Sequence, residues 1–192
     1  EAETAVREGV KNLILSDKAV NEKKAPIPMA LAIGAINSRL VDLGIRGFAS
    51  INIQTSEVLD THSFAVLLGV GATTINSYIA FDSIHQRYAK NLFGKISFEQ
   101  CVQRYIKSIE SGLLKIMSKM GISVLSSYRG GCNFEAVGLS RSIVAEYFPG
   151  MTSRISGIGI NGIEKKIKAL HKKAFQKNVS ILPIGGIYKY RK

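Results

Sequence analysis

The segment Gly157–Gly162 (GIGING) has the GxGxxG spacing, which lets a turn between a strand and a helix approach the pyrophosphate of a dinucleotide. Such a site also needs a strand before the glycines and an acidic residue about 20 positions after them, which binds the ribose. The preceding residues, Met151–Ser156 (MTSRIS), are short and polar, and no Asp or Glu follows Glu164. We therefore interpret the pattern as a glycine-rich turn into a helix.

Two further polar groups have residue types that could do chemistry. His62 lies close to Glu57 and Asp60 in the sequence, and such a group can bind a metal ion or transfer protons. No second His or Cys lies nearby, so a structural role is favoured. Ser16–Lys18 (SDK) has the residues of a catalytic trio, but polar loops commonly follow strands, and we favour that interpretation here as well.

Arginines lie at two glycine-rich turns. Arg129 and Glu135 flank one of them, and Arg154 lies in the other. The planar guanidinium binds a carboxylate or a phosphate through two parallel hydrogen bonds, or it holds backbone carbonyls together. For residues 128–139 we expect a structural role, with Glu135 as a partner for Arg129.

The cysteines exclude several kinds of site. Cys101 and Cys132 have no CxxC pattern and no regular spacing, which is typical of a protein from a reducing compartment. We expect this chain alone to form no disulfide, no zinc site and no iron–sulfur cluster, since such a cluster is normally held by several thiolates.

The net charge of +12 raises the question of nucleic-acid binding, because clustered Lys and Arg displace counterions from phosphates. Residues 165–192 hold nine basic residues and no acid, which leaves +3 for the first 164 residues. We therefore expect a basic helix that faces solvent or a partner, and no nucleic-acid binding. No apolar run approaches the roughly 18–20 residues of a membrane helix, and residues 1–10, which resemble the end of a helix, predict no targeting peptide.

The first part of the chain alternates strands and helices. The strands are short apolar or β-branched runs, and the helices show apolar residues at every third or fourth position. We predict strands over residues 12–16, 48–55 and 73–76, and helices over residues 29–43 and 61–68. This order is typical of βαβ units with a parallel sheet.

The second part begins with a long helix. Ser97 and Gln100 form a capping-box pattern, an apolar stripe follows for about six turns, and Gly121 ends it. Beyond it we predict a short strand over residues 123–127, helices over residues 140–148 and 163–175, and a linker over residues 181–192. The predicted fold class is α/β, with a parallel βαβ layer, the long helix and a Gly-rich segment.

Several segments resemble the large subunit of glutamate synthase. They are NLILSDK (Asn12–Lys18), which a proline-led helix follows, INIQTSEVLDTHSFAVLLGVGATTINSYIAF (Ile51–Phe81) and FPGMTSRISGIG (Phe148–Gly159). The most specific is GLLKIMSKMGISVLSSYRGGCNFEAVGL (Gly112–Leu139). The resemblance covers nearly the whole chain.

The resemblance implies a fragment of a modular enzyme that makes glutamate from 2-oxoglutarate and glutamine-derived ammonia. Residues 1–94 would be the C-terminal part of its central domain, and residues 95–192 the lead-in to an FMN-binding (β/α)-barrel. The remaining domains of the large subunit would be the partners, and ferredoxin or an NAD(P)H-oxidising subunit the electron donor. FMN and an iron–sulfur cluster would belong to the parent, in the cytoplasm or the plastid stroma, and this chain alone would bind no cofactor.

The resemblance carries over no catalytic or metal-binding residue. Residues that could line an active site or a tunnel are Lys119, Ser126, Tyr128, Arg129 and Glu135. We expect a scaffold that couples two active sites. The alternatives are a free-standing basic binding protein that uses the Lys-rich C-terminal helix, and a dinucleotide enzyme built on GxGxxG.

Overall fold

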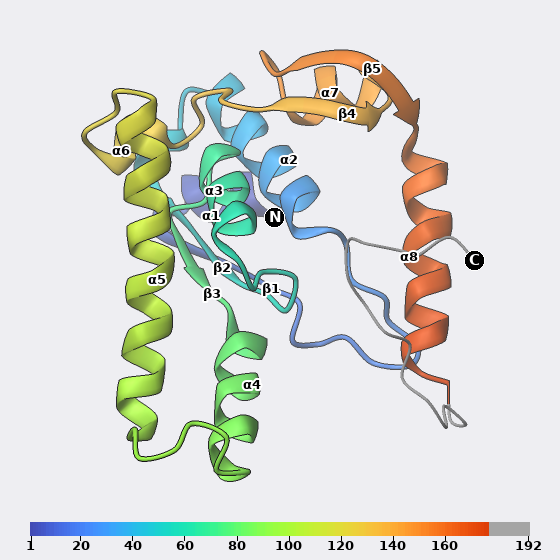
Figure 1. Ribbon diagram of the computed structural model, residues 1–192. Helices are drawn as coiled ribbons and strands as arrows, with labels where there is room; N and C mark the ends of the chain where they lie inside the picture. Colours follow the sequence, from blue (N-terminus) through green and yellow to red (C-terminus); the bar gives the residue numbers. More distant parts are fainter. Residues whose placement is uncertain (177–192) are drawn as a thin grey trace.

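The computed structural model describes residues 1–176. This part is mixed α/β, with two small parallel sheets and eight α-helices (Figure 1). The chain starts with α1 (Ala2–Arg7), in which Glu3 forms ion pairs with Arg7 and with Arg39 of the next helix. The predicted linker over residues 181–192 lies outside the described residues.

The first sheet has the predicted βαβ topology. Its strands β1 (Asn12–Ser16), β2 (Ser50–Gln54) and β3 (Thr74–Asn76) are parallel in the order β1-β2-β3. Helix α2 (Met29–Asp42) and the short 3-10 helix η1 (Arg46–Phe48) connect the first two strands, and α3 (Thr61–Gly69) connects the last two. This confirms the predicted strands and helices, with β2 shorter than the predicted range.

The two faces of this sheet differ in polarity. Alternate residues of the strands, such as Leu13, Ile51 and Ile53, are buried in a core with Ile33 and Leu40 of α2. Apart from the exposed Ile14, the opposite face carries mainly polar side chains, several of which bond to one another across the strands. Ser50 Oγ donates to Asn12 Oδ1 (2.7 Å), Thr74 Oγ1 to Asn52 Oδ1 (2.7 Å) and Ser16 Oγ to Gln54 Oε1 (2.8 Å). Parallel strands are commonly apolar on both faces, so this sheet is unusual.

Helix α2 begins and ends as its sequence predicts. Pro28 precedes it, and the Glu57 carboxylate accepts a hydrogen bond from Met29 N (2.9 Å) at its first turn. Gly44 follows the helix with φ +70°, a left-handed conformation that glycine adopts without steric cost.

A helical hairpin flanks the first sheet. Helix α4 (Tyr78–Ala89) leads into α5 (Phe98–Lys119), which packs on α3 and α4. The predicted capping box is present, since Ser97 Oγ accepts from Gln100 N (3.3 Å) and Gln100 Oε1 accepts from Ser97 N (3.2 Å). Met117 is buried, but Met120 at the end of the stripe is 43% exposed, so the stripe is only partly covered.

The strand predicted over residues 123–127 is wrong. Leu125–Tyr128 form one helical turn, α6, instead. The turn places the Tyr128 ring in a small apolar cluster with Ala65 and Leu68 of α3 and Met117 of α5. A strand here would have no neighbouring strand with which to pair, whereas the turn buries an aromatic side chain.

The second sheet has two strands that the sequence did not reveal. Strands β4 (Glu135–Leu139) and β5 (Thr152–Ile158) are parallel, with register shifts along their length, and α7 (Arg141–Tyr147) connects them. The predicted helix over residues 140–148 is thereby confirmed. Both strands are short and mostly exposed, and they lack the apolar pattern by which strands are recognised.

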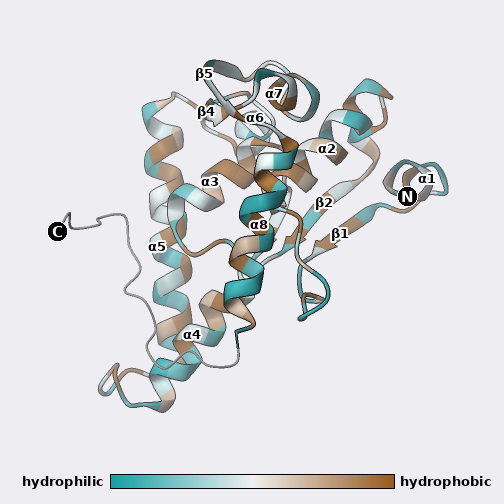
Figure 2. Ribbon diagram, turned by 90° about the vertical axis from the view of Figure 1, so that its right-hand side faces the viewer, coloured by the Kyte–Doolittle hydropathy of each residue, from teal (hydrophilic) through white to brown (hydrophobic). Residues whose placement is uncertain are grey.

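The last described helix, α8 (Ile160–Ala174), begins three residues before the predicted start and has no buried residue. Hydrophilic and hydrophobic residues alternate along it (Figure 2). It lies on the opposite side of the molecule from α5 (Figure 1). An apolar cavity of ≈ 410 Å³ separates its inner face from residues 25–35. Within residues 1–176, no helix is long and apolar enough to span a membrane.

Candidate functional site

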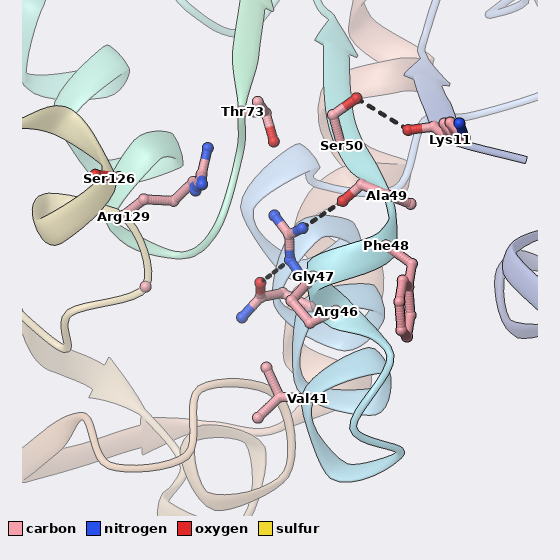
Figure 3. A pocket seen from close by; sticks show the side chains of 12 residues that line it. Lys11, Val41, Arg46, Gly47, Phe48, Ala49, Ser50, Thr73, Ser126 and Arg129 are labelled. Atoms are coloured by element: carbon pink, nitrogen blue, oxygen red, sulfur yellow. Dashed lines mark hydrogen bonds between the residues drawn. The ribbon is translucent and has the colours of Figure 1, made fainter.

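A cavity of ≈ 570 Å³ lies at the edge of the first sheet where its strands begin (Figure 3). Lys11 precedes β1, Ser50 begins β2 and Thr73 precedes β3, and all three line it. Its walls also include Arg46 of η1, together with Ser126 and Arg129 from α6 and the residue after it. Two of the five residues proposed from the sequence, Ser126 and Arg129, therefore meet at one cavity.

Arg46 holds three segments together at this edge. Its Nε donates to Asn37 Oδ1 (2.7 Å), its Nη1 to Ala49 O (2.6 Å) and its Nη2 to Gly71 O (2.8 Å). Burial lowers the pKa of Arg46, and the positive charge of Arg129 lowers it further. No sequence pattern pointed to this residue, because its three acceptors come together only in the folded chain.

Arg129 does not have the role that its spacing suggested. Among residues 1–176 its guanidinium has no hydrogen-bond or ion-pair partner, and the expected pair with Glu135 is not formed. Glu135 lies on β4, where its Oε1 is 3.7 Å from Arg154 Nε on β5. That expectation was wrong because Glu135 is the first residue of β4, and the pairing of β4 with β5 places it beside Arg154. Arg46, not Arg129, is the arginine that holds backbone carbonyls together at this edge.

The two remaining proposed residues, Tyr128 and Lys119, also lie away from the cavity. Tyr128 is 1% exposed, and its hydroxyl donates to Ala65 O (3.3 Å), inside the core rather than at the cavity. Burial raises the pKa of Tyr128. Lys119 is exposed at the C-terminal end of α5. The five residues therefore do not form one cluster.

The opposite edge of the sheet, where the strands end, is built around Asp17. This is the edge at which open α/β sheets commonly bind ligands. One Asp17 oxygen accepts from Thr55 Oγ1 (2.7 Å), Ser56 N (2.8 Å) and Ser56 Oγ (3.0 Å), and the other accepts from Tyr78 OH (2.7 Å). The carboxylate is thus engaged by donors of the chain itself, and it joins the ends of β1 and β2 to the start of α4.

This network predicts acid sensitivity. Burial raises the pKa of Asp17, but the hydrogen bonds from Ser56, Thr55 and Tyr78 outweigh it, and the net pKa lies below the ordinary value. The carboxylate therefore stabilises the fold above its unfolded pKa, and this contribution is lost as pH falls through the lower, folded pKa. We expect Asp17→Asn to lower the free energy of unfolding at pH 7 and to flatten its decline between about pH 5 and pH 2. Urea unfolding across that range, with exposed Asp82→Asn as control, measures it, and equal slopes for Asp17→Asn and wild type would contradict it.

His62, Asp60 and Glu57 are close in the sequence, but each side chain contacts a different partner. Asp60 Oδ1 caps α3 by accepting from Ser63 N (2.8 Å), and Glu57 caps α2. The His62 ring packs edge-on against Phe134 at 6.3 Å between centroids. Within the described part of the chain, no three His, Cys, Asp or Glu side chains form a group that could hold a metal ion.

The GxGxxG segment begins at the end of strand β5 (Thr152–Ile158), so our expectation that the preceding residues form no strand was wrong. Its glycines nevertheless have a packing explanation. A Cβ on Gly157 would overlap the backbone of Gly138 on β4, and one on Gly162 would lie 2.8 Å from Ile158 Cβ. The sequence after Glu164 still lacks the acidic residue that would bind the ribose.

Comparisons with known proteins identify the family. Residues 1–140 match the model of the glutamate synthase central domain. The chain is 55% identical over 192 residues to the glutamate synthase [NADPH] large chain of Azospirillum brasilense, and 41% identical over 192 residues to that of Bacillus subtilis. It is 39% identical over 191 residues to the chloroplastic ferredoxin-dependent glutamate synthase of Oryza sativa.

These matches cover 100%, 100% and 94% of this chain, but only 13%, 13% and 12% of the three relatives. The chain thus corresponds to about an eighth of the length of the proteins that it resembles. Their activity is a property of much longer chains. The 192-residue chain belongs to the glutamate synthase family, and residues 1–140 are its central-domain region.

Proposed function

We propose that this chain is a scaffold within a glutamate synthase large subunit, which makes glutamate from 2-oxoglutarate and glutamine-derived ammonia. Its task is to hold the ammonia-releasing and glutamate-forming sites at a fixed separation. The observation that carries the proposal is that the two main polar side chains, Asp17 and Arg46, form their hydrogen bonds with other segments of this chain. Asp17 binds the ends of β1, β2 and α4, and Arg46 binds α2 and the turns before β2 and β3.

A scaffold also needs surfaces on which other domains can pack. Large apolar side chains are exposed on several elements of the described chain, namely Ile14, Phe48, Leu114, Val137, Ile155 and Leu170. Ile14 lies on the edge strand β1 and is 71% exposed. Val137 and Ile155 are partners across β4 and β5 and are both exposed, so they form a contiguous apolar surface on which one of the remaining domains of the large subunit can pack.

The modular arrangement is part of the same proposal. The central-domain model matches residues 1–140, and we place a division at residue 94 within that match, from which residues 95–192 lead into a (β/α)-barrel that binds FMN. The iron–sulfur cluster lies outside this chain, and electrons come from ferredoxin or from an NAD(P)H-oxidising subunit. Relatives with NADPH and with ferredoxin in their names support both donors. The parent works in the cytoplasm or the plastid stroma.

The alternative is a free-standing basic module that binds an acidic partner through α8. The exposed lysines of this helix favour it, as does the absence of any buried residue on it. The apolar cavity between α8 and residues 25–35 favours the scaffold, because a solvated binding helix has no need for an apolar inner face.

A flavin titration tests whether the chain has a cofactor site of its own. We expect the 192-residue chain to bind no FMN and to make no glutamate, since the proposal assigns both tasks to other domains. Purified chain is titrated into FMN while the flavin absorbance and fluorescence are recorded, with a flavodoxin-type protein as positive control. A stoichiometric complex with a shifted flavin spectrum would refute the proposal.

A further inference from the structure

The cavity at the start of the strands has an uncompensated positive charge. Lys11, Arg46 and Arg129 line it, and none of its lining residues within the described part of the chain is acidic. The positive charge of Arg129 contributes to lowering the pKa of Arg46, and no acidic side chain lines the cavity to offset the two charges. Two guanidinium groups without an acid are costly to hold together, and an anion between them would remove that cost.

The donors that remain available suit an oxygen-rich ligand. A guanidinium has five N–H donors, and Arg46 uses one on each nitrogen for Asn37, Ala49 and Gly71. One N–H on each terminal nitrogen therefore remains. Those three bonds also fix the Arg46 side chain in place, so it needs no ordering before it binds a ligand.

Other groups at the cavity add to this set. The whole guanidinium of Arg129 remains available among the described residues, and the side chain points into the cavity in Figure 3. Thr73 Oγ1 accepts from Ile51 N (3.0 Å), which leaves its proton to donate. Ser126 contributes a second hydroxyl.

We propose that this cavity is an oxyanion-binding site, in which Arg46 and Arg129 hold a carboxylate or a phosphate. The volume of ≈ 570 Å³ lies in the range of small-molecule pockets, about 300–1,000 Å³. A free small anion, or an acidic side chain from another part of the large subunit, would supply this chemistry. The site is independent of the scaffold function, which can hold whether or not an anion binds here.

The first test is a titration of the ¹⁵N-labelled 192-residue chain with inorganic phosphate, and separately with succinate, at constant ionic strength. Arginine Nε–H resonances report directly on the two guanidinium groups. We expect saturable shifts, and we expect Arg129→Gln to weaken binding about tenfold or more, because it removes a charge-assisted hydrogen bond.

The matched control is Arg104→Gln, which removes the same charge from the exposed face of α5, away from the cavity. It should change the affinity by no more than about twofold. Because the Arg129 side chain has no hydrogen bond to other described residues, its variant should keep the wild-type amide spectrum. The absence of saturable shifts in the wild type, or an equal loss in both variants, would overturn the proposal.

A second arm distinguishes the two sources of the anion. Melting temperatures are measured for a full-length large subunit that carries this segment, with and without phosphate. If phosphate raises the melting temperature and Arg129→Gln abolishes that rise, the ligand is a free anion. If phosphate has no effect there while Arg129→Gln itself lowers the melting temperature and Arg104→Gln does not, an acidic side chain fills the site. If neither phosphate nor Arg129→Gln changes the melting temperature, no oxyanion is held in the assembled subunit and the proposal fails.

Discussion

Replacing Tyr128 by Ala is expected to lower the free energy of unfolding by about 3–5 kcal/mol, the range for deleting a buried aromatic side chain. Tyr128 is 1% exposed and packs with Ala65, Leu68 and Met117, so its removal leaves a cavity among three helices. Chemical denaturation of the 192-residue chain measures the effect. Tyr128→Phe, which loses only the hydrogen bond to Ala65 O, should cost about 1 kcal/mol.

The control for Tyr128 is Leu114→Ala on α5. Leu114 is 64% exposed, so its truncation should change stability by less than about 0.5 kcal/mol. A Tyr128→Ala chain as stable as the Leu114→Ala chain would mean that Tyr128 faces a ligand site instead of the core.

Replacing Arg46 by Met is expected to be the other large effect. Methionine keeps much of the aliphatic stem but removes the donors to Asn37 Oδ1, Ala49 O and Gly71 O. Ala49 and Gly71 are buried, and each carbonyl left without a donor costs about 1–3 kcal/mol. Thermal and chemical unfolding of the variant should show that the free energy of unfolding falls by the sum of these two costs.

Arg39→Met is the matched control for Arg46. Arg39 also makes guanidinium bonds, to Glu3 Oε2, but its side chain is 61% exposed. Exposed ion pairs contribute about 0–1 kcal/mol, so this variant should remain close to wild type. Equal losses in the two variants would show that burial of the Arg46 acceptors is not what makes that residue important.

The elements that the sequence predicted are those with a strong local pattern. Each of these patterns lies within a single element of the chain. They are the apolar run Asn12–Ser16, the helical spacing of apolar residues from Met29, and the capping box at Ser97. Strands β4 and β5 lack such a pattern. Their pairing depends on the close approach of Gly138 and Gly157, which are 19 positions apart in the sequence.

The candidate site was predictable only in part. Ser126 and Arg129 were found through the most family-like segment, and both line the cavity. Arg46 was missed because its acceptors at residues 37, 49 and 71 belong to three separate segments. The pairing of Arg129 with Glu135 rested on short spacing alone, which says nothing about the direction of the chain between them. The domain division at residue 94 stays a prediction.

The central claim is that this segment couples two active sites by its structure and supplies no catalytic group. The most direct measurement uses a full-length large subunit carrying Arg46→Met, with Arg39→Met as control. Its melting temperature is recorded together with glutamine hydrolysed per 2-oxoglutarate consumed. The claim predicts a lower melting temperature and hydrolysis in excess of glutamate formation for Arg46→Met alone. An unchanged melting temperature with glutamate formation abolished would contradict it, because that result would assign chemistry to this segment.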